Sequence, residues 1–309
     1  FALSALIVGA SGAISTPASS ELLFRYAPPR HAPVIFAIKQ TGVPMGGILA
    51  GILVPIFILA SGWRGAFVIS GLMCIVAAFL LQPWRARFDE HRQVGRTLMP
   101  TTELLRTVGM VFNHPQTREI SFAMFTFVGA QAVYAAFFVL FLVEGLGYEL
   151  TVAGQVFAAS QVVAVVARIF WGWLAGSFIA PRKMLALLGL GIAGSSVMTG
   201  LITDDWGIPL VLTAACAFSA TAVSWHGVLL AEVARLAPPG QVGSLTGGVL
   251  SLGYIAMMGY PALYGFILAN GGGFTFGFLI IGVPAFIAGC LLLRRPTHSA
   301  KLTEKQNDA

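Results

Sequence analysis

Charged residues are scarce in this chain of 309 residues. Asp, Glu, Lys and Arg together make up 10% of it, whereas hydrophobic residues make up 57%. A water-soluble domain needs roughly a quarter of its residues charged to cover its surface, so a soluble globular fold is excluded. The long, uniformly apolar runs also differ from the short alternating strands of a membrane barrel. We therefore predict an all-α polytopic membrane protein.

Cysteine pairs and the common catalytic motifs are missing too. The three cysteines lie singly inside apolar runs, so neither a disulfide framework nor a metal site is predicted. The chain has no His-x-x-x-His, no Gly-x-Ser-x-Gly and no pair of carboxylates within an apolar run. It also has no Gly-x-x-x-x-Gly-Lys-Ser/Thr loop for a nucleotide phosphate. These absences argue against a membrane enzyme and ATP-driven transport, and no cofactor is expected.

Apolar runs of spanning length occur nine times. A helix that crosses a bilayer needs about 18 to 25 predominantly apolar residues. No charged segment with a cleavage site precedes the first run, so we expect no signal peptide. The predicted spans cover residues 2–22, 34–59, 66–83, 120–143, 152–175, 184–203, 208–232, 243–269 and 275–293.

Basic residues gather in alternate loops between these spans. Only Arg64 lies in a loop on the other side. Because cytoplasmic loops are enriched in Lys and Arg, we place the basic side and the C-terminus in the cytoplasm, with the spans in the inner membrane. This pattern accounts for the net charge of +6, so no nucleic-acid partner is expected. Fifteen of the 18 Lys and Arg residues lie on the basic side: Arg25, Arg30, Arg85, Arg87, Arg92, Arg96, Arg106, Arg118, Arg182, Lys183, Arg235, Arg294, Arg295, Lys301 and Lys305.

The beginning and the end of the chain resemble each other. RYAPP at 25–29 recurs as RLAPP at 235–239, a shift of 210 positions. Phe67 is matched by Phe278 after a shift of 211. Spans one to three therefore look like a copy of spans seven to nine, whereas spans four to six have no counterpart. The repeat predicts about 90 further residues, roughly three spans, upstream, and a complete protein of two parallel bundles of six helices.

At this point the sequence resembles the major facilitator superfamily of secondary transporters. Gly62, Trp63 and Arg64 resemble the usual entry to that family's sixth helix. GVPMGG at 42–47 resembles the glycine–proline motif of its fifth helix, although Val43 separates the glycine from the proline. That motif is often linked to antiport, so the departure leaves the direction of coupling open.

Two segments of the second half carry the same resemblance. RIFWGWLAGSFIAPRKM at 168–184 resembles the loop motif after helix eight, but Gly176 stands where the family usually has Asp. The missing acid predicts that no interhelical charge lock forms at this loop. SWHGVLLAEVARLAPPG at 224–240 is similar to helix ten of members that carry organic anions, such as cyanate-permease-like proteins. The resemblance implies these gating and packing residues: Gly42, Pro44, Gly46, Gly47, Gly62, Trp63, Arg64, Arg182 and Lys183.

The resemblance also implies a 6+6 helical bundle from which the first three helices are missing. Residues 1–83 would be the remainder of the N-terminal bundle, family helices four to six. Residues 84–119 would form the cytoplasmic central loop, with a short amphipathic helix. Residues 120–293 would be the C-terminal six-helix bundle, and residues 294–309 a cytoplasmic tail.

Ionisable residues inside spans are costly and often functional. Lys39 and Arg168 are the two basic residues within spans. They either snorkel to the interface or face the cavity, where they would favour an anionic substrate. No Asp or Glu lies in the middle of a span. A titratable group for a coupling proton therefore lies either in the missing upstream helices or at His226, for which a packing or hydrogen-bonding role is the alternative.

The implied cavity is lined by family helices one, four, seven and ten. We predict a secondary active transporter that moves a small solute, an organic anion, across the cytoplasmic membrane by alternating access, with a proton or sodium as the coupling ion. The alternatives are efflux of amphipathic drugs by proton antiport and a non-transporting membrane sensor. The protein is expected to be monomeric in lipid. The predicted substrate-binding residues are Thr16, Ser19, Lys39, Gln131, Tyr134, Arg168, Trp225 and His226.

Overall fold

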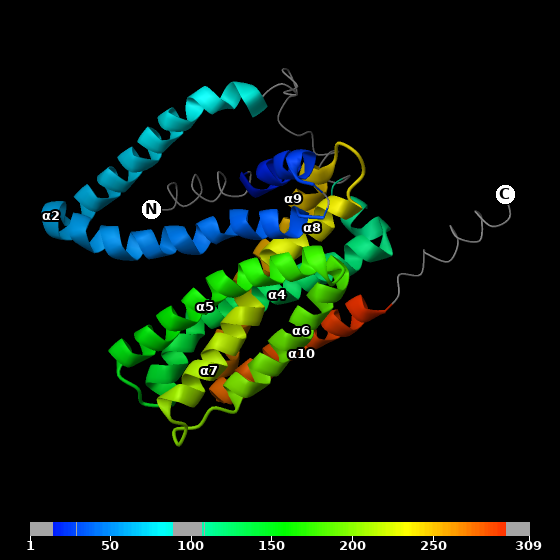
Figure 1. Cartoon of the computed structure of the whole chain (residues 1–309). Coiled ribbons are helices and arrows are strands. Elements are labelled where there is room, and N and C mark those ends of the chain that lie inside the picture. The colour runs from blue at the N-terminus through cyan, green and yellow to red at the C-terminus, as the bar shows by residue number, and fades with distance from the viewer. Residues whose placement is uncertain (1–14, 29, 89–106, 108, 295–309) are drawn as a thin grey trace. The chain divides into compact units, whose positions relative to one another are not determined.

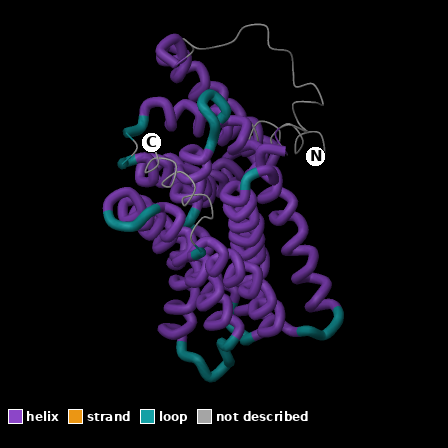
Figure 2. The backbone as a smooth tube through the Cα atoms, turned by 90° about the vertical axis from the view of Figure 1, so that its right-hand side faces the viewer, coloured by secondary structure: helices purple, strands orange, loops and turns teal. Residues whose placement is uncertain are grey.

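The computed structural model describes residues 15–28, 30–88, 107 and 109–294, and the described chain consists of helices joined by short loops (Figure 2). The apolar runs form helices because a backbone in lipid must satisfy its hydrogen bonds within the segment. Within these residues, seven helical segments are long and apolar enough to cross a membrane: Ala60–Arg85, Pro115–Gly145, Thr151–Ser177, Pro181–Gly200, Ile208–Leu236, Val242–Ala269 and Gly273–Leu293.

These seven segments correspond to predicted spans three to nine. The first predicted span, 2–22, begins outside the described residues, and the second, 34–59, lies within helix α2 (Ala32–Phe88). Of the amphipathic helix predicted in the connector, only the end at 109–113 is well described, and it is helical. The tail after residue 294 lies outside the described residues. The count of nine spans therefore stays a prediction.

The chain divides into two compact units, residues 41–103 and residues 1–40 with 104–309. Within the smaller unit, α2 turns back on itself at Gly62 (Figure 1). The φ angle of Gly62 is 69°, in the left-handed region that favours glycine. Next to the turn, the Arg64 guanidinium lies 5.0 Å from the ring centre of Trp63. The Gly-Trp-Arg motif thus separates two helical arms, as the sequence predicts.

The larger unit is a bundle of long helices (Figure 1). The helix α6 packs along α10, and α4 packs along α9. Besides the first part of α2 and a helix over 15–26, the unit contains α4 (Pro115–Leu140), the π-helical η1 (Phe141–Gly145), α5 (Leu150–Ser177), α6 (Pro181–Gly200), α7 (Ile208–Phe218), the π-helical η2 (Ser219–Val223), α8 (His226–Leu236), α9 (Val242–Ala269) and α10 (Gly273–Leu293).

Small residues bring the backbones of α6 and α10 together. A Cβ atom on Gly189 would lie 3.0 Å from the Cα of Gly289, and a Cβ on Gly289 would lie 3.0 Å from the backbone nitrogen of Leu190. Lipid offers no hydrophobic gain for helix association, so close van der Waals packing of this kind holds membrane helices together.

The internal repeat is visible in the contacts of the larger unit. A Cβ atom on Gly227 would overlap Ala37. Shifting these two positions by 210 in opposite directions gives 17 and 247. A Cβ atom on Gly247 would indeed meet the ring of Pro17, at 3.7 Å. The contact between α8 and α2 therefore has an equivalent between the helix over 15–26 and α9, as expected for parallel repeats related by a two-fold axis.

Candidate substrate-binding site

Arg168 lies deep in the larger unit, with 3% of its surface exposed. At 1.5 Å per residue it is about 14 Å along α5 from Ser177, and it does not snorkel to the helix end. Its two terminal nitrogens donate to the carbonyls of Gln40, at 2.5 Å, and Val223, at 2.6 Å. The guanidinium therefore joins the first part of α2 to η2, and its Nε is buried without a partner in the described chain.

Glycines on α5 allow α2 to approach Arg168. A Cβ atom on Gly172 would lie 2.6 Å from the Cβ of Ala37, and one on Gly176 would lie 2.5 Å from the carbonyl oxygen of Arg30. No larger side chain fits at these two positions without a shift of the backbone. The close approach therefore requires glycine at position 176.

Two further basic side chains face the same place. Lys39 is partly buried on α2. It precedes Gln40, whose carbonyl accepts a hydrogen bond from Arg168. His226, at the start of α8, comes three residues after Val223, whose carbonyl accepts from Arg168. Its ring stacks on Trp225, with 3.8 Å between ring centres, and its Nδ1 is buried without a partner among the described residues.

These three residues form what we call the basic cluster: Lys39, Arg168 and His226. Within the described part of the chain, none of them forms an ion pair with Asp or Glu. The cluster therefore carries uncompensated positive charge, and it has two buried nitrogens without partners. Such a site suits a carboxylate or another anion, which would supply the missing acceptors.

Tyr134 belongs to a different group of side chains. It is fully buried, and its ring stacks on Phe218 with 4.6 Å between centres. Its hydroxyl lies 2.7 Å from the Ser160 Oγ and donates to the carbonyl of Ala215 at 3.2 Å. With these contacts filled, the hydroxyl has little capacity left for a substrate.

Replacing Tyr134 with Phe is expected to destabilise the protein by about 1 kcal/mol, because one buried hydrogen-bonded hydroxyl is lost. Since the hydroxyl is occupied by Ser160, the KM for transport should stay within a factor of about two. Thermal unfolding in detergent and uptake kinetics in liposomes would check both. A large rise in KM at unchanged stability would instead assign Tyr134 to the substrate.

The remaining predicted binding residues are dispersed. Ser19 donates to the carbonyl of Ser15 at 2.6 Å within its own helix, as expected for Ser and Thr in membrane helices, and Thr16 lies one turn before it, partly buried. Trp225 is fully buried and donates to the carbonyl of Ala222 at 2.8 Å. Gln131 is partly exposed, and its Oε1 is buried without a partner among the described residues.

The expectation that no interhelical charge lock forms at the loop after α5 is wrong. Arg182, at the start of α6, forms an ion pair with Glu119 of α4. It also reaches the carbonyl of Leu291 on α10, at 3.4 Å. The acid comes from another helix, so the sequence around Gly176 could not reveal it.

Two other predicted gating residues, Lys183 and Gly42, show no close packing in the structure. Lys183 is exposed. A Cβ atom on Gly42 would meet nothing within 4 Å. The gating and packing role predicted for Pro44, Gly46 and Gly47 stays a prediction.

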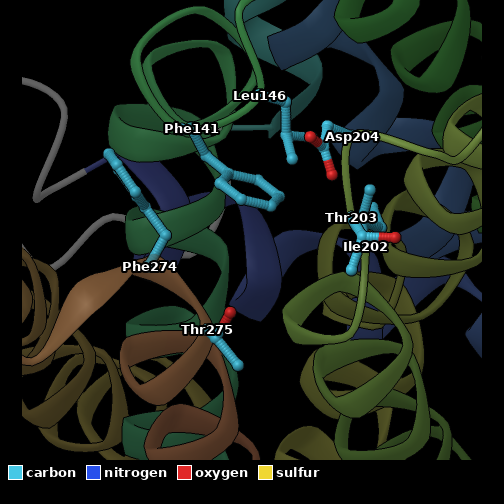
Figure 3. Close-up of a pocket in the computed structure, with 8 residues that line it drawn as sticks. Phe141, Leu146, Ile202, Thr203, Asp204, Phe274 and Thr275 are labelled. Atoms are coloured by element: carbon cyan, nitrogen blue, oxygen red, sulfur yellow. The ribbon is translucent and has the colours of Figure 1, made fainter.

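A cavity of about 370 Å³ opens at the end of the bundle where α4 and α6 finish and α10 begins (Figure 3). Its lining includes the aromatic residues Phe141 and Phe274, the hydroxyl-bearing Thr203 and Thr275, and the acid Asp204. A carboxylate would repel an anion, so this cavity differs in chemistry from the basic cluster. Its lining residues are Phe141, Gly145, Leu146, Ile202, Thr203, Asp204, Phe274 and Thr275.

Comparison with known proteins gives consistent results. The Major Facilitator Superfamily pattern matches residues 1–258. A hexuronate transporter of Bacillus subtilis is 24% identical over 290 residues, covering 89% of this chain and 68% of the relative. A probable sulfoacetate transporter of Cupriavidus necator, SauU, is 22% identical over 305 residues, covering 89% of this chain and 67% of the relative. The chain thus spans about two thirds of the length of these relatives.

The fold has a counterpart among solved structures. The E. coli fucose:proton symporter FucP superposes with a TM-score of 0.68 at 18% identity, covering 90% of this chain and 73% of that protein. Together with the seven apolar helices, these matches identify an integral multi-pass membrane protein. The named relatives are all transporters and not enzymes, as the sequence predicts.

Proposed function

This chain belongs to the Major Facilitator Superfamily, and we propose that it carries a small organic anion across the membrane by alternating access. It is a transporter of small solutes, as its relatives are. In the proposed mechanism, two helical bundles rock around a substrate held between them. The basic cluster binds the charged group of the anion.

The observation that carries this proposal is the convergence of three basic side chains from three helices, none of them paired with an acid among the described residues. Arg168 is almost completely buried, and a buried charge normally needs a partner of opposite sign. Backbone carbonyls of Gln40 and Val223 solvate it in this structure. An anion at the cluster would provide the countercharge and accept from the unpartnered Arg168 Nε.

The names of the relatives point to the same substrate class. Hexuronate is a sugar acid with a carboxylate, and sulfoacetate carries a carboxylate and a sulfonate. Both are small, and both would be attracted by Lys39, Arg168 and His226. We therefore propose a carboxylate or sulfonate of similar size for this chain.

The proposed orientation in the membrane rests on the sequence pattern. The Lys and Arg bias of the loops supports a cytoplasmic C-terminus and the inner membrane. A proton or sodium ion is the proposed coupling ion, and the candidate for carrying a proton is His226, whose buried Nδ1 has no partner among the described residues. The protein is proposed to act as a monomer.

The test is uptake of radiolabelled glucuronate and of neutral glucose by the intact protein in liposomes. We expect glucuronate uptake and little glucose uptake. The double variant Lys39→Ala with Arg168→Ala should lose at least about 95% of glucuronate uptake, because a buried charged hydrogen bond contributes roughly 1.5–3 kcal/mol and two cations are removed.

The matched control is Arg118→Ala, which removes one exposed positive charge at the start of α4. It should transport like the wild type. Equal uptake by the wild type and the double variant would contradict the proposal, and so would equal transport of glucuronate and glucose.

A further inference from the structure

The seventh predicted span is not one continuous α-helix. The helix α7 ends at Phe218, the π turn η2 follows, and α8 begins at His226. A π turn contains one extra residue, and its carbonyls pair with the backbone N–H five residues on instead of four. In a membrane-spanning helix, a carbonyl that lacks such a partner around the turn needs another donor.

Side chains supply those donors for four of the five residues of η2. Two of the four bonds come from within span seven, and the other two come from α5. The donors are the Ser224 hydroxyl to the Ser219 carbonyl (3.0 Å), the Trp171 indole to the Ala220 carbonyl (2.7 Å), the Trp225 indole to the Ala222 carbonyl (2.8 Å) and the Arg168 guanidinium to the Val223 carbonyl (2.6 Å).

One face of α5 lines the whole break. Ser160, Ala164, Arg168 and Trp171 are four, four and three residues apart, so they share a face of the helix. Each of them bonds to the segment around η2. Besides the two bonds already given, the Ser219 hydroxyl donates to the Ser160 Oγ (3.1 Å) and the Ser224 hydroxyl donates to the Ala164 carbonyl (2.9 Å).

Arg168 and Trp171 differ in what they can do beyond this. Arg168 carries the charge of the basic cluster. Trp171 is uncharged, and its indole nitrogen is used by Ala220, so it has no donor left for a substrate. We propose that Trp171 is a positioning residue, whose bond to Ala220 keeps η2 in π geometry and thereby points His226 at Arg168.

The physical reason lies in the competing α geometry. Without the indole, the Ala220 carbonyl can regain its α-helical partner, the backbone N–H four residues on, at Ser224. Removing the extra residue of the π turn would rotate α8 relative to α7 by about 100°, the angle per residue of an α-helix. His226 would then turn away from the basic cluster. This inference rests on the proposed function, since it assumes that the cluster holds the anion.

The test compares two tryptophans on the same helix. Trp171→Phe removes the donor and keeps an aromatic ring. Trp173→Phe is the matched control, because Trp173 is exposed and, within the described part of the chain, packs against the rings of Phe170 and Phe178. Glucuronate uptake by the intact protein in liposomes gives KM and the maximal rate, and thermal unfolding gives stability.

We expect Trp171→Phe to raise the KM for glucuronate about tenfold, with the maximal rate and the unfolding temperature close to those of Trp173→Phe. Trp171→His keeps a ring N–H and should restore much of the affinity for glucuronate. It also provides a second variant in case the Phe variant fails to fold. A lower unfolding temperature with unchanged KM would mean that Trp171 only stabilises the fold, and would overturn the inference. Equal KM values for the two Phe variants would overturn it as well.

The failure of this inference is distinguishable from failure of the proposed function. If Lys39→Ala with Arg168→Ala loses uptake while Trp171→Phe behaves like Trp173→Phe, the anion site stands and the positioning role is wrong. If the double variant keeps full uptake, the anion site itself is wrong, and the role of Trp171 in pointing His226 at it is overturned together with it.

Discussion

Arg168→Lys is expected to lower anion transport at least about tenfold, although the positive charge is kept. The guanidinium donates simultaneously to the carbonyls of Gln40 and Val223. Lysine offers a single ammonium group on a differently shaped stem and cannot reproduce this planar fork. One buried carbonyl left without a donor costs about 1–3 kcal/mol, and 1.4 kcal/mol corresponds to a factor of about ten.

Uptake of radiolabelled glucuronate into liposomes measures this loss. The matched control is Arg235→Lys. Arg235 is largely exposed and pairs with Glu232 one turn away on α8, and a lysine can keep that pair. If Arg168→Lys transported like the wild type, positive charge alone would suffice, and the bridge between α2 and η2 would be irrelevant to transport.

Gly176→Asp is expected to destabilise the protein and lower its transport rate, although it introduces the acid that the loop motif in the sequence analysis led us to expect. The new Cβ atom would lie 2.5 Å from the carbonyl oxygen of Arg30, well inside van der Waals contact. The carboxylate would also face that carbonyl oxygen without a donor. Overpacking of this kind costs about 1–3 kcal/mol, and the added buried charge increases the loss.

The measurements are the unfolding temperature in detergent and the initial rate of uptake, and both should fall. Gly154→Asp is the control, because it makes the same change on the same helix at a position where a Cβ atom meets nothing within 4 Å. An acid near the start of α5 is also favourable for the helix dipole. Wild-type stability of Gly176→Asp would show that Arg30 does not approach α5 as closely as described.

The ion pairs show why some contacts could be predicted from the sequence and others could not. Glu232 and Arg235 are three residues apart on one helix, so their ion pair follows from spacing alone. Arg182 instead finds Glu119, 63 positions away. Nothing near Arg182 in the sequence marks that acid, and the absence of Asp at position 176 led to the opposite expectation. Local spacing predicts pairs within a helix, whereas pairs between helices depend on the packing.

The π turn of span seven had no sequence signal at all. Residues 219–225 contain neither Gly nor Pro, the residues that usually mark an interrupted helix. The interruption is stabilised by donors on α5, above all Trp171, which the apolar pattern merely counts as a hydrophobic residue. Ser160 and Ser224 escaped prediction for the same reason, because a serine in a membrane helix usually bonds to its own backbone.

The sequence by itself determined that the chain lies in a lipid bilayer, that it is helical and which family it resembles. The scarce charge, the spanning apolar runs and the one-sided basic loops depend only on composition and order along the chain. It also singled out Arg168, since a cation within an apolar run is costly wherever the helix lies. Only the tertiary structure decided that Arg168 faces inward, that its partners are the carbonyls of Gln40 and Val223, and that His226 lies beside it. Those contacts join segments more than fifty positions apart, and their geometry is set by how closely α2, α5 and α8 pack.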